Sequence, residues 1–332
     1  MNESAESPDL DSSSPVVSVC IQTYQHVDFI AECIESILAQ QTNFPFEIII
    51  GEDESVDGTR AVCEEYAAKY PGKIRLFLRS RKDVIYCNGK ATGRYNLMQN
   101  LLACKGKYIA ICEGDDYWTD PLKLQKQYDI LEAKPEIVLT YHWQRIAFPD
   151  KSGRYTEKEA PKDTQGYFSR EITDAGDIFT FRLRPQSRTL MFRNIFSHEA
   201  FPAWFYKVQF GDLSLCFILG RHGNYYFLDE EMAVYRMTGK GASSIFNNKK
   251  GYITGNKAWL STWAYALEHH ENKYEHQAFE GIQVFLSRIR KATANSLLMR
   301  LNLVWFILFK LEFRPAFKRK LIRLLFEKRY EQ

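Results

Sequence analysis

Apolar residues in the first half of the chain gather in short continuous runs, and the segments between these runs have the periodicity of amphipathic helices. Runs of this length are typical of strands that are covered on both faces. After the first run, apolar side chains recur at positions 30, 33, 34, 37 and 38, which is helical spacing. The expected strands are Val16–Ile21, Phe46–Gly51, Ile74–Leu78, Tyr108–Cys112 and Ile137–Tyr141. Since strands and helices alternate, we predict a parallel, doubly wound α/β sheet.

The pattern becomes less regular after Pro149. The polar stretch from Lys151 to Asp163 predicts a mobile loop, and the chain from Lys257 onward is predicted to be helical with few breaks. The strand-like runs between them are Thr189–Arg193, Tyr225–Leu228 and Met232–Arg236. The first residues are acidic and rich in serine, which is typical of a disordered tail. The predicted organisation is a tail over 1–14, an α/β domain over 15–245 and a helical extension over 246–332.

Composition changes this picture little, but the distribution of charge adds to it. The 332 residues are 45% hydrophobic and 26% charged, which is ordinary for a soluble globular protein. The net charge is +3, yet the segment from Ser296 to Gln332 alone carries +6 and leaves −3 for the remainder. A slightly acidic body argues against nucleic acid as a partner. The seven cysteines have no zinc or redox spacing, so reduced thiols and a cytoplasmic protein are expected.

The basic C-terminal segment also has two apolar features. Leu303–Phe309 is apolar all round, but the surrounding run is too short to cross a bilayer, which takes about 20 residues. A helix after Pro315 would place Phe317, Leu321, Leu324 and Leu325 on one face and basic residues around the others. Two placements fit this pattern. The helix either lies in the headgroup region of an anionic membrane, as a peripheral attachment, or docks on the α/β domain.

The strongest chemical signal follows the run Tyr108–Cys112. Glu113, Asp115 and Asp116 come directly after it, and Asp120 with Pro121 would begin a helix as N-cap and first residue. Ligands of open α/β sheets bind beyond the carboxyl ends of the strands, and clustered carboxylates there suit Mg²⁺ or Mn²⁺. A cation held in this way can neutralise a diphosphate leaving group. The alternative is an acidic loop that only caps a helix.

Several other chemistries lack their motifs in this sequence. There is no GxGxxG after the first expected strand and no GxxxxGK[ST], which argues against a Rossmann cofactor site and a P-loop. GxSxG and HExxH are also absent, and the seven histidines have no ligand spacing. A bound metal would therefore have to be held by carboxylates.

Five segments, in order from about Val16 to Ser244, resemble the inverting, nucleotide-sugar-dependent glycosyltransferases of family 2. They are SVCIQTYQHVDFIAECIESILAQ, GEDESVDGT, GRYNLMQNLLACKGKYIAICEGDDYW, SRTLMFR and GDLSLCFILGRHGNYYFLDEEMAVYRMTGKGASS. The resemblance implies a GT-A fold, with a doubly wound, Rossmann-like mixed sheet and a C-terminal α-helical extension. It also implies metal-assisted sugar transfer, with inversion, from a nucleoside diphosphate, preferably UDP. The acceptor would be a saccharide or lipid-linked saccharide hydroxyl, in bacterial surface polysaccharide biosynthesis.

The resemblance also implies roles for single residues on the nucleotide side. Thr23 and Tyr24 match the loop that packs on the base, where Tyr24 would either stack on uracil or cap the core. Asp53 matches an acid that accepts a hydrogen bond from the pyrimidine N3–H, which favours uracil over cytosine. Arg94 matches an arginine near the base and phosphates, and its alternative is a surface position on a helix.

The metal and diphosphate roles rest on the acidic cluster. The family usually carries Asp-x-Asp where this chain has Glu113-Gly114-Asp115-Asp116. Asp115 is expected to bind Mn²⁺ or Mg²⁺ directly. Asp116, as a second ligand, and Glu113, which could bind through water, would support the metal or reach the ribose. The family's Tyr-Arg-x-His lacks its histidine here, and Arg236 and Lys240 are expected to meet the diphosphate.

The acceptor side is expected around Asp212 and Trp118. Asp212 falls at the position of the family's catalytic base, which would take the proton of the acceptor hydroxyl, and its alternative is a helix N-cap. Trp118 would border the acceptor site with an aromatic face. The Gln-x-x-Arg-Trp of processive synthases is absent, so we expect one sugar per binding event.

Two rival functions stay open at this point. A sugar-phosphate nucleotidyltransferase would also use a carboxylate site, but it normally has a glycine-rich, basic loop after the first strand, unlike Gln22–Gln25. An inactive nucleotide-sugar-binding protein would explain Glu113 and the missing histidine. Such a protein would bind UDP without turnover.

Overall fold

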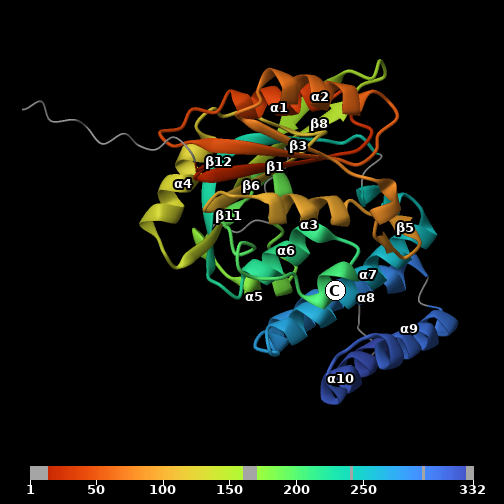
Figure 1. Ribbon diagram of the computed structural model, residues 1–332. Helices are drawn as coiled ribbons and strands as arrows, with labels where there is room; N and C mark the ends of the chain where they lie inside the picture. Colours follow the sequence, from red (N-terminus) through yellow and green to blue (C-terminus); the bar gives the residue numbers. More distant parts are fainter. Residues whose placement is uncertain (1–13, 160–169, 240–241, 294–295, 327–332) are drawn as a thin grey trace, which may run out of the picture.

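The computed structural model describes residues 14–159, 170–239, 242–293 and 296–326. Its centre is a ten-stranded sheet with the order β10-β12-β8-β11-β6-β1-β2-β3, in which β7 pairs with β12 and β9 with β8 (Figure 1). The strands are β1 (Val17–Thr23), β2 (Phe46–Glu52), β3 (Ile74–Leu78), β6 (Tyr108–Glu113), β7 (Tyr117–Trp118), β8 (Ile137–Pro149), β9 (Tyr155–Glu159), β10 (Ile172–Thr173), β11 (Met191–Arg193) and β12 (Asn224–Arg236). A separate two-stranded ribbon consists of β4 (Tyr86–Cys87) and β5 (Lys90–Ala91).

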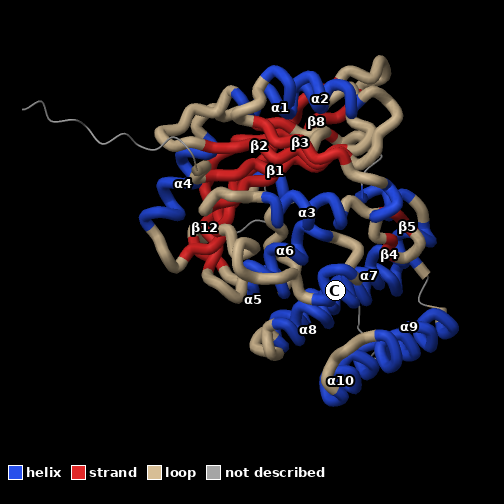
Figure 2. The backbone as a smooth tube through the Cα atoms, in the orientation of Figure 1, coloured by secondary structure: helices blue, strands red, loops and turns tan. Residues whose placement is uncertain are grey.

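Helices cover both faces of this sheet. Figure 2 shows α1 (Ile30–Leu38) and α2 (Thr59–Lys69) on one face, with α3 (Arg94–Ala103) and α6 (Gly211–Leu219) on the other. The other helices are α4 (Lys123–Ala133), α5 (Ala175–Phe179), α7 (Lys249–His269), α8 (Glu275–Ala292), α9 (Leu297–Lys310) and α10 (Pro315–Phe326). Short 3₁₀ turns include η1 (Arg81–Asp83), η3 (Ser187–Thr189), η4 (Ala203–Tyr206) and η5 (Ala242–Asn247).

The predicted α/β alternation is confirmed for the first half of the chain. Strands β3, β2, β1 and β6 are parallel neighbours, so that Val17 lies opposite both Phe46 and Tyr108. Side chains of β1 alternate between two cores: Val19 packs in the core under α1, and Cys20 packs in the core under α3. All four strands therefore end at the same edge of the sheet.

The sheet is mixed beyond β6, as the resemblance to the GT-A glycosyltransferases implies. Strand β11 comes from the second half of the chain and inserts antiparallel between β6 and β8. The predicted runs Tyr225–Leu228 and Met232–Arg236 form one irregular strand, β12, which pairs parallel with β8. The predicted loop over 151–163 is partly wrong, because residues 155–159 form β9 against β8, and 160–163 lie outside the described residues.

Helices α7 and α8 share the core on the α3 side of the sheet. Trp263 of α7 is fully buried, and its indole N–H donates to the carbonyl of Phe179 at 2.8 Å. Gly281 of α8 packs so closely that an added Cβ would lie 2.1 Å from the same carbonyl oxygen. The expected helical extension thus packs on the sheet domain through a continuous apolar core.

The apolar face predicted after Pro315 is covered by protein. Phe317, Leu321, Leu324 and Leu325 of α10 are all buried, and the Phe317 ring lies 6.0 Å from that of Phe279 on α8. This face of α10 therefore packs on the other C-terminal helices. Figure 1 shows α9 and α10 side by side at the end of the molecule away from α1 and α2. Among the described helices, none combines the length and apolar character that crossing a bilayer requires.

Candidate active site

A cavity of about 2060 Å³ opens at the edge where β1, β2 and β6 end. Parallel strands place their carboxyl ends, and the loops that follow them, at such an edge. The strand-end loops line one side of the cavity, and the start of α6 lines another. The expected site residues that line it are Thr23, Tyr24, Asp53, Arg94, Glu113, Asp115, Asp116, Asp212 and Arg236. Lys240 lies outside the described residues.

Asp116 is a buried part of the cavity lining, and both of its oxygens accept hydrogen bonds. Its Oδ2 accepts from Nε of Arg188 at 2.5 Å, and its Oδ1 accepts from the backbone N–H of Arg236 at 2.9 Å. Burial raises the pKa of Asp116, and the Arg188 charge opposes part of that rise. A carboxylate held in this way fixes the acidic turn, and its oxygens are not open to a cation. The geometry therefore does not favour Asp116 as a metal or ribose ligand.

Glu113 joins the same buried network. It accepts a hydrogen bond from the Ser187 hydroxyl, and its Oε2 lies 3.8 Å from Nε of Arg188. Burial raises the pKa of Glu113 as well. Ser187 and Arg188 belong to the segment SRTLMFR, to which the sequence analysis assigned no role. The sequence did offer one signal for Arg188. It lies in a segment that matches the family, and no acidic partner for it was expected from the sequence.

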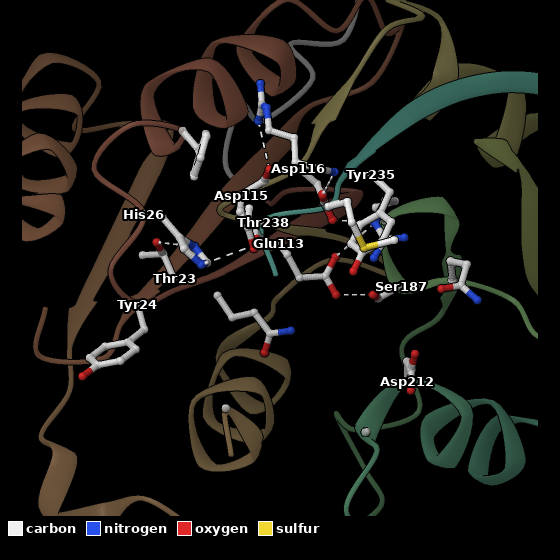
Figure 3. Close-up of a pocket in the computed structure, with 18 of the residues that line it drawn as sticks. Thr23, Tyr24, His26, Glu113, Asp115, Asp116, Ser187, Asp212, Tyr235 and Thr238 are labelled. Carbon is white, nitrogen blue, oxygen red and sulfur yellow. Dashed lines mark hydrogen bonds and ion pairs between the residues drawn. The ribbon is translucent and has the colours of Figure 1, made fainter. Parts of the chain in front are cut away.

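Asp115 is a strand-end carboxylate that faces the cavity, as does Glu113. Its side chain is 15% exposed, and its Oδ2 lies 3.7 Å from Nε2 of His26. The other ring nitrogen of His26 is 3.2 Å from the Thr23 hydroxyl, which orients the imidazole (Figure 3). His26 was missed because a single histidine in a loop has no ligand spacing to recognise.

The donor set around Asp115 fits a divalent cation that shares its coordination with a ligand. Within the described ranges, no three His, Cys, Asp or Glu side chains gather into a ready metal cage. One carboxylate with a neighbouring imidazole leaves most coordination positions to diphosphate oxygens and water, which is how Mg²⁺ is commonly held. The open face of Asp115 is suited to this arrangement.

Asp212 lies across the cavity from this cluster, as Figure 3 shows. It is the second residue of α6, and Phe210 occupies the N-cap position, so the alternative role of Asp212 as N-cap is wrong. Its Oδ1 accepts from the backbone N–H of Leu213 at 2.9 Å. In the part of the chain that the structure describes, its second oxygen has no hydrogen-bonding partner. Burial raises the pKa of Asp212.

Arg94 is buried beside the start of α6. Its Nη1 donates to the carbonyl of Phe205 at 2.6 Å, and burial lowers its pKa to about 10. A Cβ on Gly211 would lie 3.7 Å from its Nε, so Arg94 packs against the turn that carries Asp212. The surface alternative for Arg94 is therefore wrong.

The nucleotide side is organised by Arg81 of η1, which the sequence analysis did not single out. Its guanidinium lies 4.1 Å from the centre of the Tyr24 ring, and its Nη1 is 2.7 Å from Oδ2 of Asp53. Tyr24 is 38% exposed, so it does not cap the core. Oδ1 of Asp53 is buried and has no hydrogen-bonding partner among the described residues.

Trp118 does not border the cavity, and this corrects the expectation for the acceptor side. Its strand β7 pairs with β12, which buries the indole, and its N–H donates to the carbonyl of Arg188 at 3.0 Å.

Arg236 is held by Glu32 and by the carbonyl of Asp115, and its guanidinium lies 4.2 Å from the ring centre of Tyr117. These contacts make Arg236 a rigid part of the wall.

Aromatic and basic side chains from loops and from helices α7 and α8 complete the wall next to Asp212. The Phe210 ring stacks on Trp259 of α7 at 4.0 Å between ring centres. The guanidinium groups of Arg184 and Arg288 lie 5.0 Å and 5.1 Å from the ring centre of Phe181. All five residues line the cavity. No motif marks them, because Trp259 and Arg288 follow the matched segments in sequence, while Phe181, Arg184 and Phe210 lie between them.

Known proteins share both the sequence pattern and this architecture. An uncharacterised Mycobacterium tuberculosis protein is 30% identical over 270 residues, which are 80% of this chain and 72% of that protein. A Bacillus subtilis glycosyltransferase named for teichuronic acid biosynthesis is 25% identical over 251 residues, covering 74% and 86%. Named relatives of this chain thus include a glycosyltransferase of polysaccharide biosynthesis.

Solved structures support the fold. S. aureus TarS in complex with UDP aligns with a TM-score of 0.55 at 14% identity, covering 87% of this chain and 78% of that one. A Pyrobaculum calidifontis mannosyltransferase in complex with GDP-Man and Mn²⁺ aligns at 0.52 and 15% identity, covering 95% and 85%. These likenesses confirm the predicted GT-A fold with C-terminal helices.

The family model of glycosyl transferase family 2 matches residues 18–190. That range begins in β1 and ends just after η3, so it contains both the strand-end carboxylates and the arginine that pairs with them. The architecture shared with these solved structures agrees with this match, and the chain belongs to glycosyl transferase family 2.

Proposed function

We propose that this glycosyltransferase moves one sugar per binding event from a UDP-sugar to a saccharide hydroxyl, with inversion at the anomeric carbon. The observation that carries the proposal is the placement of Asp212 opposite Asp115 across one cavity. In-line displacement requires a proton acceptor on one side of the sugar and stabilisation of the leaving group on the other. The cavity offers both.

The donor is proposed to bind along the ends of β1 and β2. The half-exposed ring of Tyr24 would stack on the base, and the unpartnered Oδ1 of Asp53 would accept the N3–H of uracil. Arg81 holds both side chains in place, through its ion pair with Asp53 and its contact with the Tyr24 ring. The complex of S. aureus TarS with UDP supports this choice of nucleotide.

The diphosphate is proposed to lie near Asp115 and His26, where Mn²⁺ or Mg²⁺ would be held. When bound, such a cation would neutralise charge on the departing diphosphate. The protein's own contribution is to hold Asp115 open to the cavity, through the contacts of Asp116 with Arg188 and Arg236. The Mn²⁺ complex of the P. calidifontis mannosyltransferase supports this proposal.

Asp212 is proposed to take the proton of the acceptor hydroxyl. Its raised pKa makes the carboxylate a better proton acceptor than an exposed aspartate, because burial disfavours its charged form. The acceptor would lie on the aromatic wall of Phe210 and Trp259, since flat apolar faces suit sugar rings. Arg184 and Arg288 on the same wall favour an acceptor that carries a carboxylate or phosphate.

Substitution of Asp212 by Asn tests this function. Donors are first chosen by thermal shift with UDP, GDP and UDP-sugars in Mn²⁺, since a ligand at a hundred times its Kd stabilises by about 2.7 kcal/mol. With the best donor and a panel of saccharide acceptors, Asp212→Asn is expected to lose about a hundredfold or more in kcat. Donor affinity should stay within about twofold, because the base does not touch the nucleotide.

The matched control is Asp28→Asn, which removes a more exposed carboxylate at the cavity rim. It should leave turnover unchanged. Equal turnover of the wild type and a folded Asp212→Asn variant would refute the assignment of the base. UDP binding without turnover of any donor by the wild type would favour the inactive, nucleotide-sugar-binding alternative.

A further inference from the structure

The outer side of α9 is an apolar stripe that the described protein leaves uncovered. Its large side chains are between 41% and 78% exposed: Leu297, Leu298, Leu301, Trp305, Leu308 and Phe309. At 100° per residue these positions fall within about 120° of the helix circumference. The opposite side carries Leu303 and Ile307, which are buried. The helix is therefore apolar on two sides, and packing on the protein uses only one of them.

Basic side chains are concentrated on α9 and on the neighbouring helix α10. Residues 296–326 contain seven Lys or Arg and a single acid, Glu312, so the described part of the α9–α10 pair carries a net charge of +6. Lys310 follows the stripe on α9 itself, and Arg319, Lys320 and Arg323 are exposed on the neighbouring α10. Their long side chains can keep the charged group in water while the stem lies along an apolar surface. Apolar area and positive charge thus occur together at this end of the molecule.

We infer that the α9 stripe binds an anionic membrane surface, with the helix lying parallel to it. A helix of 14 residues is about 21 Å long, which is too short to cross a bilayer but suits the boundary between headgroups and acyl chains. Trp305 lies in the middle of the stripe, and its amphipathic ring is a side chain favoured at that boundary. The exposed basic residues of α9 and α10 would contact anionic headgroups.

The same charge argues against a second copy of this chain as the occupant. A symmetric dimer through the stripe would bring two segments of +6 together, and like charges across an interface oppose association. An anionic surface is complementary where a second copy is repulsive. This inference does not depend on the donor, base or metal proposed above, because none of their residues lies on α9.

The test is flotation of the full-length protein with vesicles. Vesicles of phosphatidylglycerol and phosphatidylcholine in equal parts are compared with vesicles of phosphatidylcholine alone. The variant Leu301→Gln/Trp305→Gln/Phe309→Gln removes the centre of the stripe, and all three residues are at least 51% exposed, so folding should be preserved. Val56→Gln/Leu102→Gln is the matched control, since these side chains are 87% and 48% exposed elsewhere.

We expect the wild type and the control to float with anionic vesicles, and less so at high salt. The triple variant should bind at least about tenfold more weakly, because three apolar side chains no longer enter the bilayer. Equal binding of the triple variant, or no flotation of the wild type, would overturn the inference. Light scattering that shows a wild-type dimer and a monomeric triple variant would overturn it in favour of a second copy. Unchanged UDP binding in the triple variant separates this result from a failure of the proposed function.

Discussion

Removal of the Arg188 guanidinium should destabilise the protein far more than removal of an exposed arginine. Arg188 is 6% exposed, and it lies 2.5 Å from Oδ2 of Asp116 and 3.8 Å from Oε2 of Glu113. It also donates to the side-chain oxygen of Gln144 at 2.7 Å. In Arg188→Met, Asp116 would keep one hydrogen bond from the Arg236 backbone and lose its only charged partner among the described residues.

Breaking a buried pair by removing one partner costs about 3 to 5 kcal/mol, because a charge is left buried without compensation. That is a large share of the about 5 to 15 kcal/mol that stabilises an ordinary domain. Arg145→Met is the matched control, since Arg145 is 45% exposed and pairs with Glu231 at 3.1 Å. Exposed pairs contribute at most about 1 kcal/mol, so the control should remain close to the wild type.

The loss of unfolding free energy in Arg188→Met should also depend on pH, and the pKa of Asp116 determines in which direction. Burial already raises the pKa of Asp116, and loss of Arg188 would raise it further. Above the pKa of an unfolded aspartate, about 3.9, the unfolded chain ionises freely while the buried carboxyl resists ionisation. The difference in unfolding free energy between the variant and the wild type should therefore be larger near pH 8 than near pH 5.

Urea unfolding followed by circular dichroism measures these differences, with the midpoint and slope fitted at each pH. Adding Asp116→Asn to Arg188→Met removes the uncompensated charge and should recover part of the loss and most of the pH dependence. If Arg188→Met costs no more than Arg145→Met, or costs more near pH 5 than near pH 8, the reasoning is wrong.

Two further outcomes concern the ligands. Chelation by EDTA should abolish transfer by the wild type, and full activity in EDTA would refute the metal proposal. Asp115→Ala should weaken Mn²⁺-dependent UDP binding measured by calorimetry, because Asp115 faces the cavity next to His26. Arg288→Gln should raise the KM for a carboxylated or phosphorylated acceptor about tenfold while leaving the donor KM unchanged, because a charge-assisted hydrogen bond is lost on the acceptor side alone. Steady-state kinetics with charged and neutral acceptors would decide this, and an equal effect on both would refute it.

The sequence predicted those parts of the fold that local patterns determine. The runs that became β2 and β6 form buried strands within one residue of the expected bounds. Strand β3 has the expected bounds, although only Ile74 in it is buried. Strand β11 could not be placed, because its position between β6 and β8 depends on pairing partners far away in the chain. The helix after Pro121 begins at Lys123 instead, because the side chain of Asp120 accepts from the N–H of Leu122 and closes a turn first.

In the candidate site, too, the sequence predicted what a local pattern determines and missed what depends on distant contacts. The acidic cluster was visible because charged residues directly after an apolar run are unusual. Which carboxylate is open to the cavity was not visible, since it depends on Arg188, some 70 residues later in the chain, and on the backbone of Arg236. Trp118 was misplaced because its position beside the acids says nothing of the pairing with β12 that buries it. His26 and Arg81 carry no motif, and only the packing of their loops brings them to Asp115 and Asp53.

The antiparallel insertion of β11 has a consequence for how the chain acquires its structure during synthesis. Ala110 of β6 pairs with Met191, so the edge of β6 stays open until the ribosome has added the intervening segment. At roughly 5 to 20 residues per second this takes on the order of ten seconds. During that interval an unpaired, apolar strand is available for wrong partners. An excised fragment that ended at residue 190, where the family match ends, would keep this open edge permanently, because β11 begins at Met191.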